Sequence, residues 1–159
     1  MTTKRKPSIL VVDDEQMVVT SITAFLEADG EFEVFGFTDP EQALRFAESQ
    51  PIDVVLSDYR MPGMNGLQFL RRIKELRPEA SRLLLTSHAD ARSAIDAINQ
   101  VALFQYLEKP WDDEQLLLSI RSGADRARLL RELRERVGEL DSAHHVIKDA
   151  QSRLIHAFL

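Results

Sequence analysis

Five short apolar runs alternate along this chain with five stretches in which apolar residues recur at helical spacing. Runs rich in Val, Ile and Leu are typical of strands that are buried on both faces, as in a parallel sheet. The alternation predicts an α/β fold in which a five-stranded parallel sheet is wrapped on both faces by helices. The expected strands cover residues 8–12, 33–37, 54–58, 82–86 and 104–107.

Turn and cap residues mark where the intervening helices begin and end. Asp39-Pro40 indicates a helix start, because Asp caps a helix and Pro is tolerated in its first turn. Arg77-Pro78 ends a later amphipathic helix. Residues 87–90 are predicted to form a loop and cap before a helix over 91–99, which has only a modest apolar face. That face comprises Ala94, Ile95 and Ile98.

Polar residues that suit chemistry gather where the expected strands end. Asp13 and Asp14 directly follow the first strand, and Asp58 closes the third. Thr86 closes the fourth strand and Lys109 follows the fifth. Because the carboxyl ends of parallel strands meet at one edge of the sheet, we expect these five side chains to share a cleft.

The chemistry of this set points to phosphoryl transfer. Three carboxylates in one cleft repel one another, and hard oxygen ligands of this kind suit Mg²⁺. A lysine can pair with a carboxylate or a phosphoryl oxygen, and a threonine hydroxyl can hydrogen-bond to one. Taken singly, each residue has a plain structural interpretation; the acid pair, for example, could simply cap the next helix. Together they favour transfer onto a carboxylate, which gives an aspartyl phosphate.

Charge and composition exclude several other classes of protein. The 159 residues carry a formal net charge of -6, which argues against a duplex DNA-binding surface, because such surfaces gather Lys and Arg. Cysteine is absent, which excludes disulfides and cysteine-bound zinc. The apolar run 9–12 is too short for a signal peptide or a membrane span. We therefore expect a cytoplasmic protein whose partners are neither nucleic acid nor membrane.

The last part of the sequence predicts one long helix. An apolar stripe from Leu116 to Leu130 is expected to pack on the sheet. Beyond it, apolar residues recur in alternating steps of four and three, with Leu or Ile at each d position, which favours a parallel two-stranded coiled coil. The alternative is a single helix that folds back on its own domain. The heptad positions are Leu133, Val137, Leu140, His144, Ile147, Gln151, Leu154 and Phe158.

Taken in order, these features resemble the receiver domain of two-component response regulators. The resemblance implies a flavodoxin-like (βα)5 fold with strand order 2-1-3-4-5 over residues 1–123. Residues 124–159 would then be an extended helix leading to a missing output domain, so we expect the chain to be a fragment of a longer protein. The resemblance rests on Asp13-Asp14, Asp58, Met61-Pro62, Gly66, Thr86, Tyr106 and Lys109-Pro110.

The resemblance also implies which residues accept the phosphoryl group and bind metal. Asp58 would accept the group from the phosphohistidine of a histidine kinase or from a phosphotransfer protein. Asp14, Asp58 and the backbone carbonyl of Arg60 would bind Mg²⁺ directly, and Asp13 would assist through water. The domain would therefore be a regulatory phosphoacceptor and not an enzyme.

The remaining motif residues are implied to read out the phosphorylated state. Lys109 would contact the phosphoryl group, and the peptide before Pro110 would be cis. Thr86 would move toward a phosphoryl oxygen and Tyr106 would swing inward behind it. These movements would change the face formed by the fourth helix, fifth strand and fifth helix, and the pairing of a homodimer through the C-terminal helix.

The expected lifetime of the phosphoryl group depends on two positions that vary among such domains. Arg60 and His88 occupy the positions that shape phosphoryl lifetime in such domains, and both are bulky, so we expect the group to outlast a fast chemotaxis-type signal. One alternative is a dimeric scaffold that resembles a receiver but is independent of phosphorylation. Another is a haloacid-dehalogenase-type phosphatase, which uses Asp-x-Asp after its first strand. Asp13-Asp14-Glu15 lacks that spacing.

Overall fold

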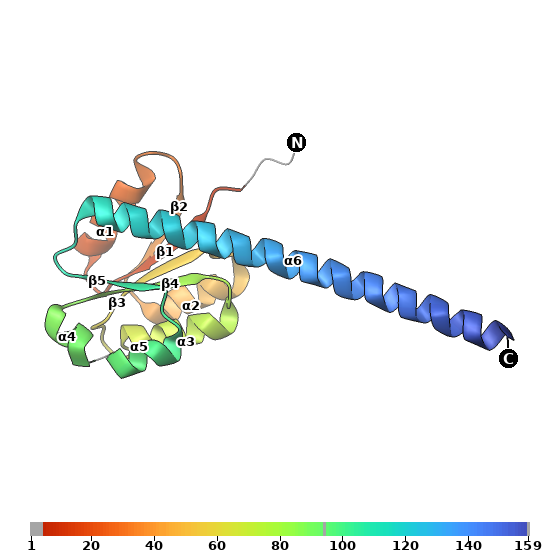
Figure 1. Cartoon of the computed structure of the whole chain (residues 1–159). Helices are drawn as coiled ribbons and strands as arrows, with labels where there is room; N and C mark the ends of the chain where they lie inside the picture. Colours follow the sequence, from red (N-terminus) through yellow and green to blue (C-terminus); the bar gives the residue numbers. More distant parts are fainter. Residues whose placement is uncertain (1–4, 94, 159) are drawn as a thin grey trace. The chain divides into compact units, whose positions relative to one another are not determined.

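A five-stranded parallel sheet with strand order β2-β1-β3-β4-β5 forms the centre of the fold (Figure 1). The computed structural model of the protein describes residues 5–93 and 95–158. The predicted flavodoxin-like fold is confirmed, including the strand order and the long C-terminal helix. The strands are β1 Ser8–Val12, β2 Glu33–Phe37, β3 Val54–Asp58, β4 Ser81–Thr86 and β5 Gln105–Glu108. The helices are α1 Gln16–Glu27, α2 Pro40–Ser49, α3 Gly66–Leu76, α4 His88–Ser93, α5 Ile95–Val101 and α6 Asp113–Phe158.

Helices cover both faces of the sheet because successive strand residues point to opposite sides. In β1, Leu10 packs with α2 and α3, whereas Ile9 packs with α1 and the first turns of α6. All five residues of β1 and of β3 are buried, as expected for strands covered on both faces. The sheet therefore holds two apolar cores and leaves its carboxyl edge free for polar side chains.

The helix starts follow the predicted cap chemistry at two places. The Asp39 carboxylate accepts a hydrogen bond from the Glu41 N–H, and Pro40 occupies the first helical position of α2. Asn65 and Gln68 form a reciprocal capping box at the start of α3. These local bonds satisfy backbone donors that the first turn of a helix would otherwise leave unpaired.

The fourth helical segment begins earlier than predicted. Helix α4 starts at His88 and not at residue 91, because Ser87 acts as its cap: the Ser87 hydroxyl accepts the Asp90 N–H at 3.1 Å. Asp90, predicted to be part of the loop and cap, is thus inside the helix. Helix α5 follows residue 94, and Ile95, expected on the apolar face, is exposed. The side chains of Ala94 and Ile98 lie outside the described residues.

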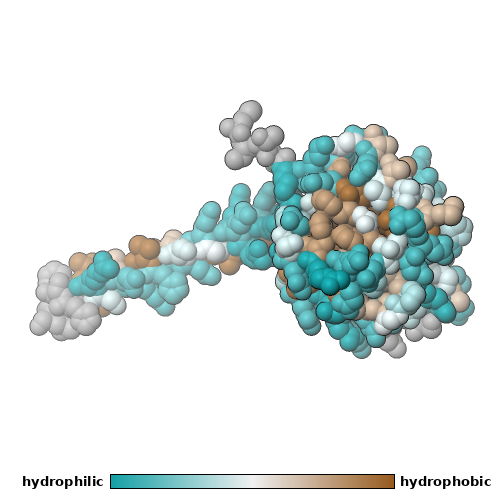
Figure 2. Space-filling view, turned by 180° about the vertical axis from the view of Figure 1, so that it is seen from behind, coloured by the Kyte–Doolittle hydropathy of each residue, from teal (hydrophilic) through white to brown (hydrophobic). Residues whose placement is uncertain are grey.

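The chain divides into two compact units, Met1–Ala127 and Arg128–Leu159. The predicted boundary between residues 123 and 124 remains a prediction. The second unit is helical and exposes several apolar side chains, and Figure 2 shows such side chains among polar ones along this helix. Of its heptad positions, Leu133, Leu140, Ile147 and Leu154 are each more than half exposed. The Phe158 side chain lies outside the described residues. Within the described chain, no helix combines the length and apolarity that a membrane span requires.

Candidate functional site

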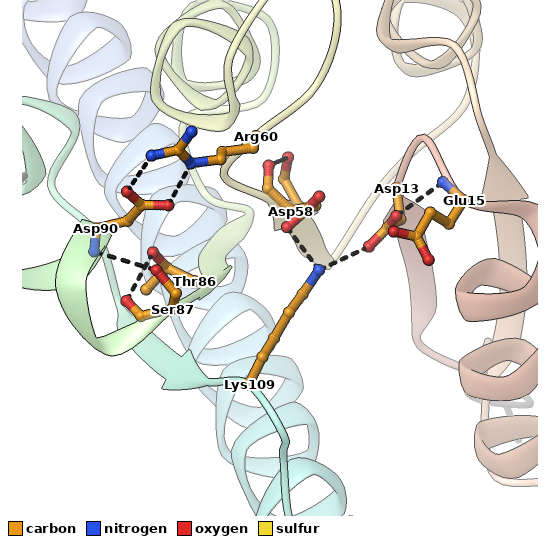
Figure 3. Close-up of polar contacts among 9 residues, drawn as sticks. Asp13, Glu15, Asp58, Arg60, Thr86, Ser87, Asp90 and Lys109 are labelled. Atoms are coloured by element: carbon orange, nitrogen blue, oxygen red, sulfur yellow. Dashed lines mark hydrogen bonds and ion pairs between the residues drawn. The ribbon is translucent and has the colours of Figure 1, made fainter.

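The carboxyl edge of the sheet brings four of the five predicted polar residues, Asp14, Asp58, Thr86 and Lys109, into one cleft, and the fifth, Asp13, is buried beside it in contact with Lys109 (Figure 3). Asp58 is the last residue of β3 and Thr86 the last of β4, and Lys109 directly follows β5. Carboxylate oxygens of Asp13, Asp14 and Asp58 all lie within 4.8 Å of one another. The cleft has a volume of about 300 Å³ and is lined by Asp14, Glu15, Asp58, Tyr59, Arg60, Thr86, Ser87, Asp90 and Lys109.

Lys109 connects two of the three carboxylates. Its Nζ lies 2.8 Å from Oδ1 of Asp58 and 3.4 Å from Oδ2 of Asp13. The other oxygen of Asp13 accepts the Glu15 N–H at 2.9 Å. Asp13 is 1% exposed and Asp58 is 7% exposed, whereas Asp14 is exposed. The peptide between Lys109 and Pro110 is cis, as the resemblance implies.

Burial and the neighbouring negative charges raise the free energy of the ionised carboxylates. Burial raises the pKa of Asp58; the hydrogen bond and charge of Lys109 oppose this, and the charge of Asp14 adds to it. Burial likewise raises the pKa of Asp13, with the charge of Asp58 contributing, although the Glu15 N–H and Lys109 act in the opposite direction. Burial lowers the pKa of Lys109, but its bonds and charge interactions with Asp58 and Asp13 outweigh that effect and leave the pKa raised. The cluster therefore holds more negative charge than one lysine compensates.

The loop after β3 packs closely against the end of that strand and against β4. The Tyr59 N–H donates to the Leu85 carbonyl at 2.9 Å, and the Gly66 N–H donates to the Tyr59 carbonyl at 2.7 Å. A Cβ atom at Gly66 would overlap the carbonyl oxygen of Asp58, so a side chain there would push the loop away from the strand. Glycine at this position therefore lets the loop close beside Asp58.

The donor set fits a hard divalent cation. Two buried carboxylates and one exposed carboxylate offer oxygen ligands on one side of the cleft, and the exposed face of Asp14 leaves room for the water that Mg²⁺ retains. A cation there would also offset the excess negative charge of the cluster. The residues expected to hold Mg²⁺, Asp13, Asp14, Asp58 and the loop residue Arg60, therefore lie together.

The two predicted switch residues occupy different places. Thr86 lines the cleft, and its hydroxyl donates to the Ser87 carbonyl at 3.3 Å. Tyr106 lies outside the cleft and is 44% exposed; it lines a separate cavity of about 400 Å³ together with Trp111 and Gln115. The structure thus places Thr86 with the acids but leaves Tyr106 facing outward.

Two polar contacts of α4 were not predicted from the sequence. Arg60 binds both carboxylate oxygens of Asp90, at 2.7 and 2.8 Å. Nδ1 of His88 lies 3.0 Å from Oε1 of Glu108. The partners are 30 and 20 residues apart in sequence, so helical or strand spacing carries no signal for either pair.

Comparison with known proteins agrees with this geometry. Residues 9–121 match the family model of the response regulator receiver domain. The hydrogenase transcriptional regulatory protein HoxA from Cupriavidus necator is 29% identical over 149 residues, which is 94% of this chain and 30% of HoxA. The chain thus spans about 30% of the length of that relative.

Solved receiver domains are similar over most of the chain. The signal receiver domain of an HD domain-containing protein from Pseudomonas fluorescens Pf-5 has a TM-score of 0.75 and 33% identity, covering 83% of this chain and 96% of that one. A response regulator receiver domain protein from Clostridium thermocellum has a TM-score of 0.71 and 37% identity, covering 78% of this chain and 98% of that one.

Proposed function

This chain belongs to the family of response regulator receiver domains, and we propose on that basis that Asp58 is its phosphoacceptor. A receiver is a regulatory phosphoacceptor domain of two-component systems. The observation that carries the assignment to Asp58 is its position at the end of β3, where Lys109 lies 2.8 Å from its Oδ1 atom within the carboxylate cluster.

In the proposed reaction, a carboxylate oxygen of Asp58 attacks the phosphorus of a phosphohistidine on a histidine kinase or phosphotransfer protein. A P–O bond to Asp58 forms as the P–N bond breaks, and the electron pair remains on the imidazole, which takes up a proton from solvent. The Lys109 ammonium is already in contact with Asp58 and would pair with the transferred oxygens. Catalysis would consist mainly of positioning and charge compensation.

Mg²⁺ would neutralise charge on the transferring group and on the carboxylates. Asp14, Asp58 and the carbonyl of Arg60 are proposed as direct ligands, with Asp13 held one water further away. The accumulation of buried negative charge around one lysine supports this assignment.

Readout is proposed to pass through Thr86 and Tyr106. The Thr86 hydroxyl would exchange its bond to the Ser87 carbonyl for one to a phosphoryl oxygen. Tyr106, which is outward and half exposed, would then turn inward behind it. The change would reach α4, β5 and the start of α6, and the long helix would pass it to an output domain.

The experiment that tests the phosphoacceptor is intact mass after incubation with Mg²⁺ and acetyl phosphate. We expect one phosphoryl adduct on the wild type and none on Asp58→Ala. Asp29→Ala, which removes an exposed acid in the turn after α1, is the matched control and should retain the adduct. A wild type that takes up no phosphoryl group would favour the phosphorylation-independent scaffold instead.

The C-terminal helix is proposed to pair with a second copy of the chain. Leu133, Leu140, Ile147 and Leu154 recur every seven residues and are exposed, so an isolated helix leaves this stripe in water. Leu140→Lys should convert a dimer to a monomer in light scattering. Glu135→Lys introduces the same side chain outside the seam and should leave the dimer intact. A wild type that is monomeric throughout would contradict this proposal without affecting the phosphoacceptor.

A further inference from the structure

A bidentate ion pair closes one side of the cleft beside the proposed phosphoacceptor. Nε and one terminal nitrogen of Arg60 bind the two carboxylate oxygens of Asp90 (Figure 3). Arg60 follows Asp58 by two residues in the loop after β3, while Asp90 belongs to α4. Both residues line the same cleft as Asp58. The pair therefore ties the acceptor loop to α4 at the edge of the site.

The two partners differ in freedom. The Asp90 side chain is only 12% exposed, and its backbone N–H is bound by the Ser87 hydroxyl at 3.1 Å. The Arg60 side chain is 79% exposed, so its long, flexible stem can turn without opening a cavity. The Arg60 hydrogen bond also lowers the pKa of Asp90, so this carboxylate remains an ionised acceptor. The guanidinium is the movable partner and Asp90 the fixed one.

We propose that Asp90 competes with the phosphoryl group on Asp58 for the Arg60 guanidinium. This inference rests on the proposed function of Asp58. Before transfer, Asp90 offers a ready bidentate acceptor and holds Arg60 at the rim of the cleft. The phosphoryl group would carry about 1.5 to 2 negative charges on three strong acceptor oxygens, in place of the single charge of the Asp58 carboxylate, and a guanidinium binds such oxygens in the same forked geometry.

Movement of Arg60 would have two consequences. The guanidinium would cover the phosphoryl group and hinder the approach of water, which gives a physical basis for the long lifetime expected from a bulky residue at this position. Loss of the Asp90 bond would also remove one tie between α4 and the loop after β3, while the contact between His88 and Glu108 joins the first turn of α4 to β5. The phosphorylated state would thus reach α4 by a route separate from Thr86.

Equilibrium binding of beryllofluoride, a non-covalent phosphoryl mimic, tests the competition in the presence of a fixed concentration of Mg²⁺. Four proteins are compared: wild type, Asp90→Asn, Arg60→Gln and the double variant, with binding followed by fluorine NMR. Replacing the Arg60 side chain leaves its backbone carbonyl in place. Glu15→Gln removes one negative charge from the lining of the same cleft and measures the effect of charge alone.

The competition predicts a non-additive cycle. Asp90→Asn should tighten beryllofluoride binding about three- to tenfold, because one charge-assisted pair no longer holds Arg60 back. Arg60→Gln should weaken beryllofluoride binding by a similar factor. In the Arg60→Gln background, Asp90→Asn should change the affinity no more than Glu15→Gln does, because no guanidinium remains to be released. The half-life of the phosphoryl group on Asp58 should lengthen in Asp90→Asn and shorten in Arg60→Gln.

Two results would overturn the inference. Asp90→Asn could have the same effect whether or not Arg60 is present, which would mean that Asp90 acts by its own charge. Alternatively, Asp90→Asn could leave binding unchanged while the wild type accepts both acetyl phosphate and beryllofluoride. A wild type that accepts neither would instead defeat the proposed function, and the competition with it.

Discussion

Both edges of the sheet bury charged side chains. At the amino edge each charge has hydrogen-bond or ion-pair partners, whereas at the carboxyl edge the negative charges outnumber the positive ones. At the amino edge, buried Arg82 donates to the backbone carbonyls of Pro78, Ala80, Val101 and Ala102 at 3.0 to 3.3 Å. Buried Asp53 at the same edge accepts the Ser8 N–H at 2.7 Å and lies 3.4 Å from Arg5. At the carboxyl edge, Asp13 and Asp58 share a single lysine and repel each other.

The difference separates structural charge from functional charge. At the amino edge, backbone groups bind Arg82 and Asp53, and the guanidinium of Arg5 lies close to Asp53, so these charges are compensated within the folded protein. The carboxyl edge keeps an excess of negative charge that a cation or a change of state would relieve. Removing a charge should therefore destabilise the first edge and stabilise the second.

The largest effect is expected from Arg82→Met. The substitution keeps an unbranched stem but leaves buried carbonyls without donors, so the free energy of unfolding should fall by about 3 kcal/mol. Urea unfolding measures the loss. Arg72→Met is the matched control, since Arg72 forms an exposed pair with Glu41 at 3.2 Å, and its effect should stay within about 0.5 kcal/mol. Equal losses in the two variants would show that the carbonyl contacts of Arg82 contribute no more to the free energy of unfolding than an exposed ion pair does.

Asp13→Asn and Asp53→Asn form a pair of opposite expected sign. Asp13→Asn should raise the free energy of unfolding at pH 7 by on the order of 1 kcal/mol, because it removes a buried like charge. Asp53→Asn should lower it by about as much, since the amide replaces a charged acceptor and ends the attraction to Arg5. Two changes of the same sign would remove the distinction between the edges.

The stabilisation by Asp13→Asn should also depend on pH. The pKa of Asp13 is raised in the folded protein, so its protonated form favours folding and its ionised form opposes it. The gain from the amide is therefore full at pH 7 and is lost as the pH falls through the raised folded pKa toward the unfolded value. Unfolding curves at pH 7 and pH 4 check this, and an undiminished gain at pH 4 would contradict it.

The smallest expected effect is stabilisation by Mg²⁺. At a free concentration equal to the dissociation constant, a cation that binds only the folded protein adds about 0.4 kcal/mol. The thermal midpoint should rise with Mg²⁺ for the wild type and stay constant for Asp58→Asn. If both proteins gain equally, the cation is acting elsewhere than at the carboxylate cluster.

Much of the site was predictable because the residues that follow parallel strands all lie at the same edge of the sheet. Asp58 and Lys109 lie 51 positions apart, from 58 to 109, yet each follows a buried apolar run and both must therefore emerge at one edge. Strand β1 matches its predicted range because its apolar run ends abruptly in acids. Helix α4 was placed too late because the hydroxyl of Ser87 begins the helix, while Asp90 looked like the better cap.

The sequence by itself therefore determined the fold class, the edge at which the acids and the lysine meet, and the existence of a long amphipathic helix, since all of these depend on residue periodicity. Only the tertiary structure decided which charges pair. Arg60 reaches from the loop after β3 to Asp90 in α4, and Arg82 reaches from β4 to carbonyls in the preceding loop and at the end of α5. Such contacts depend on where flexible side chains find an acceptor once the backbone is folded, and no repeat along the chain encodes that distance.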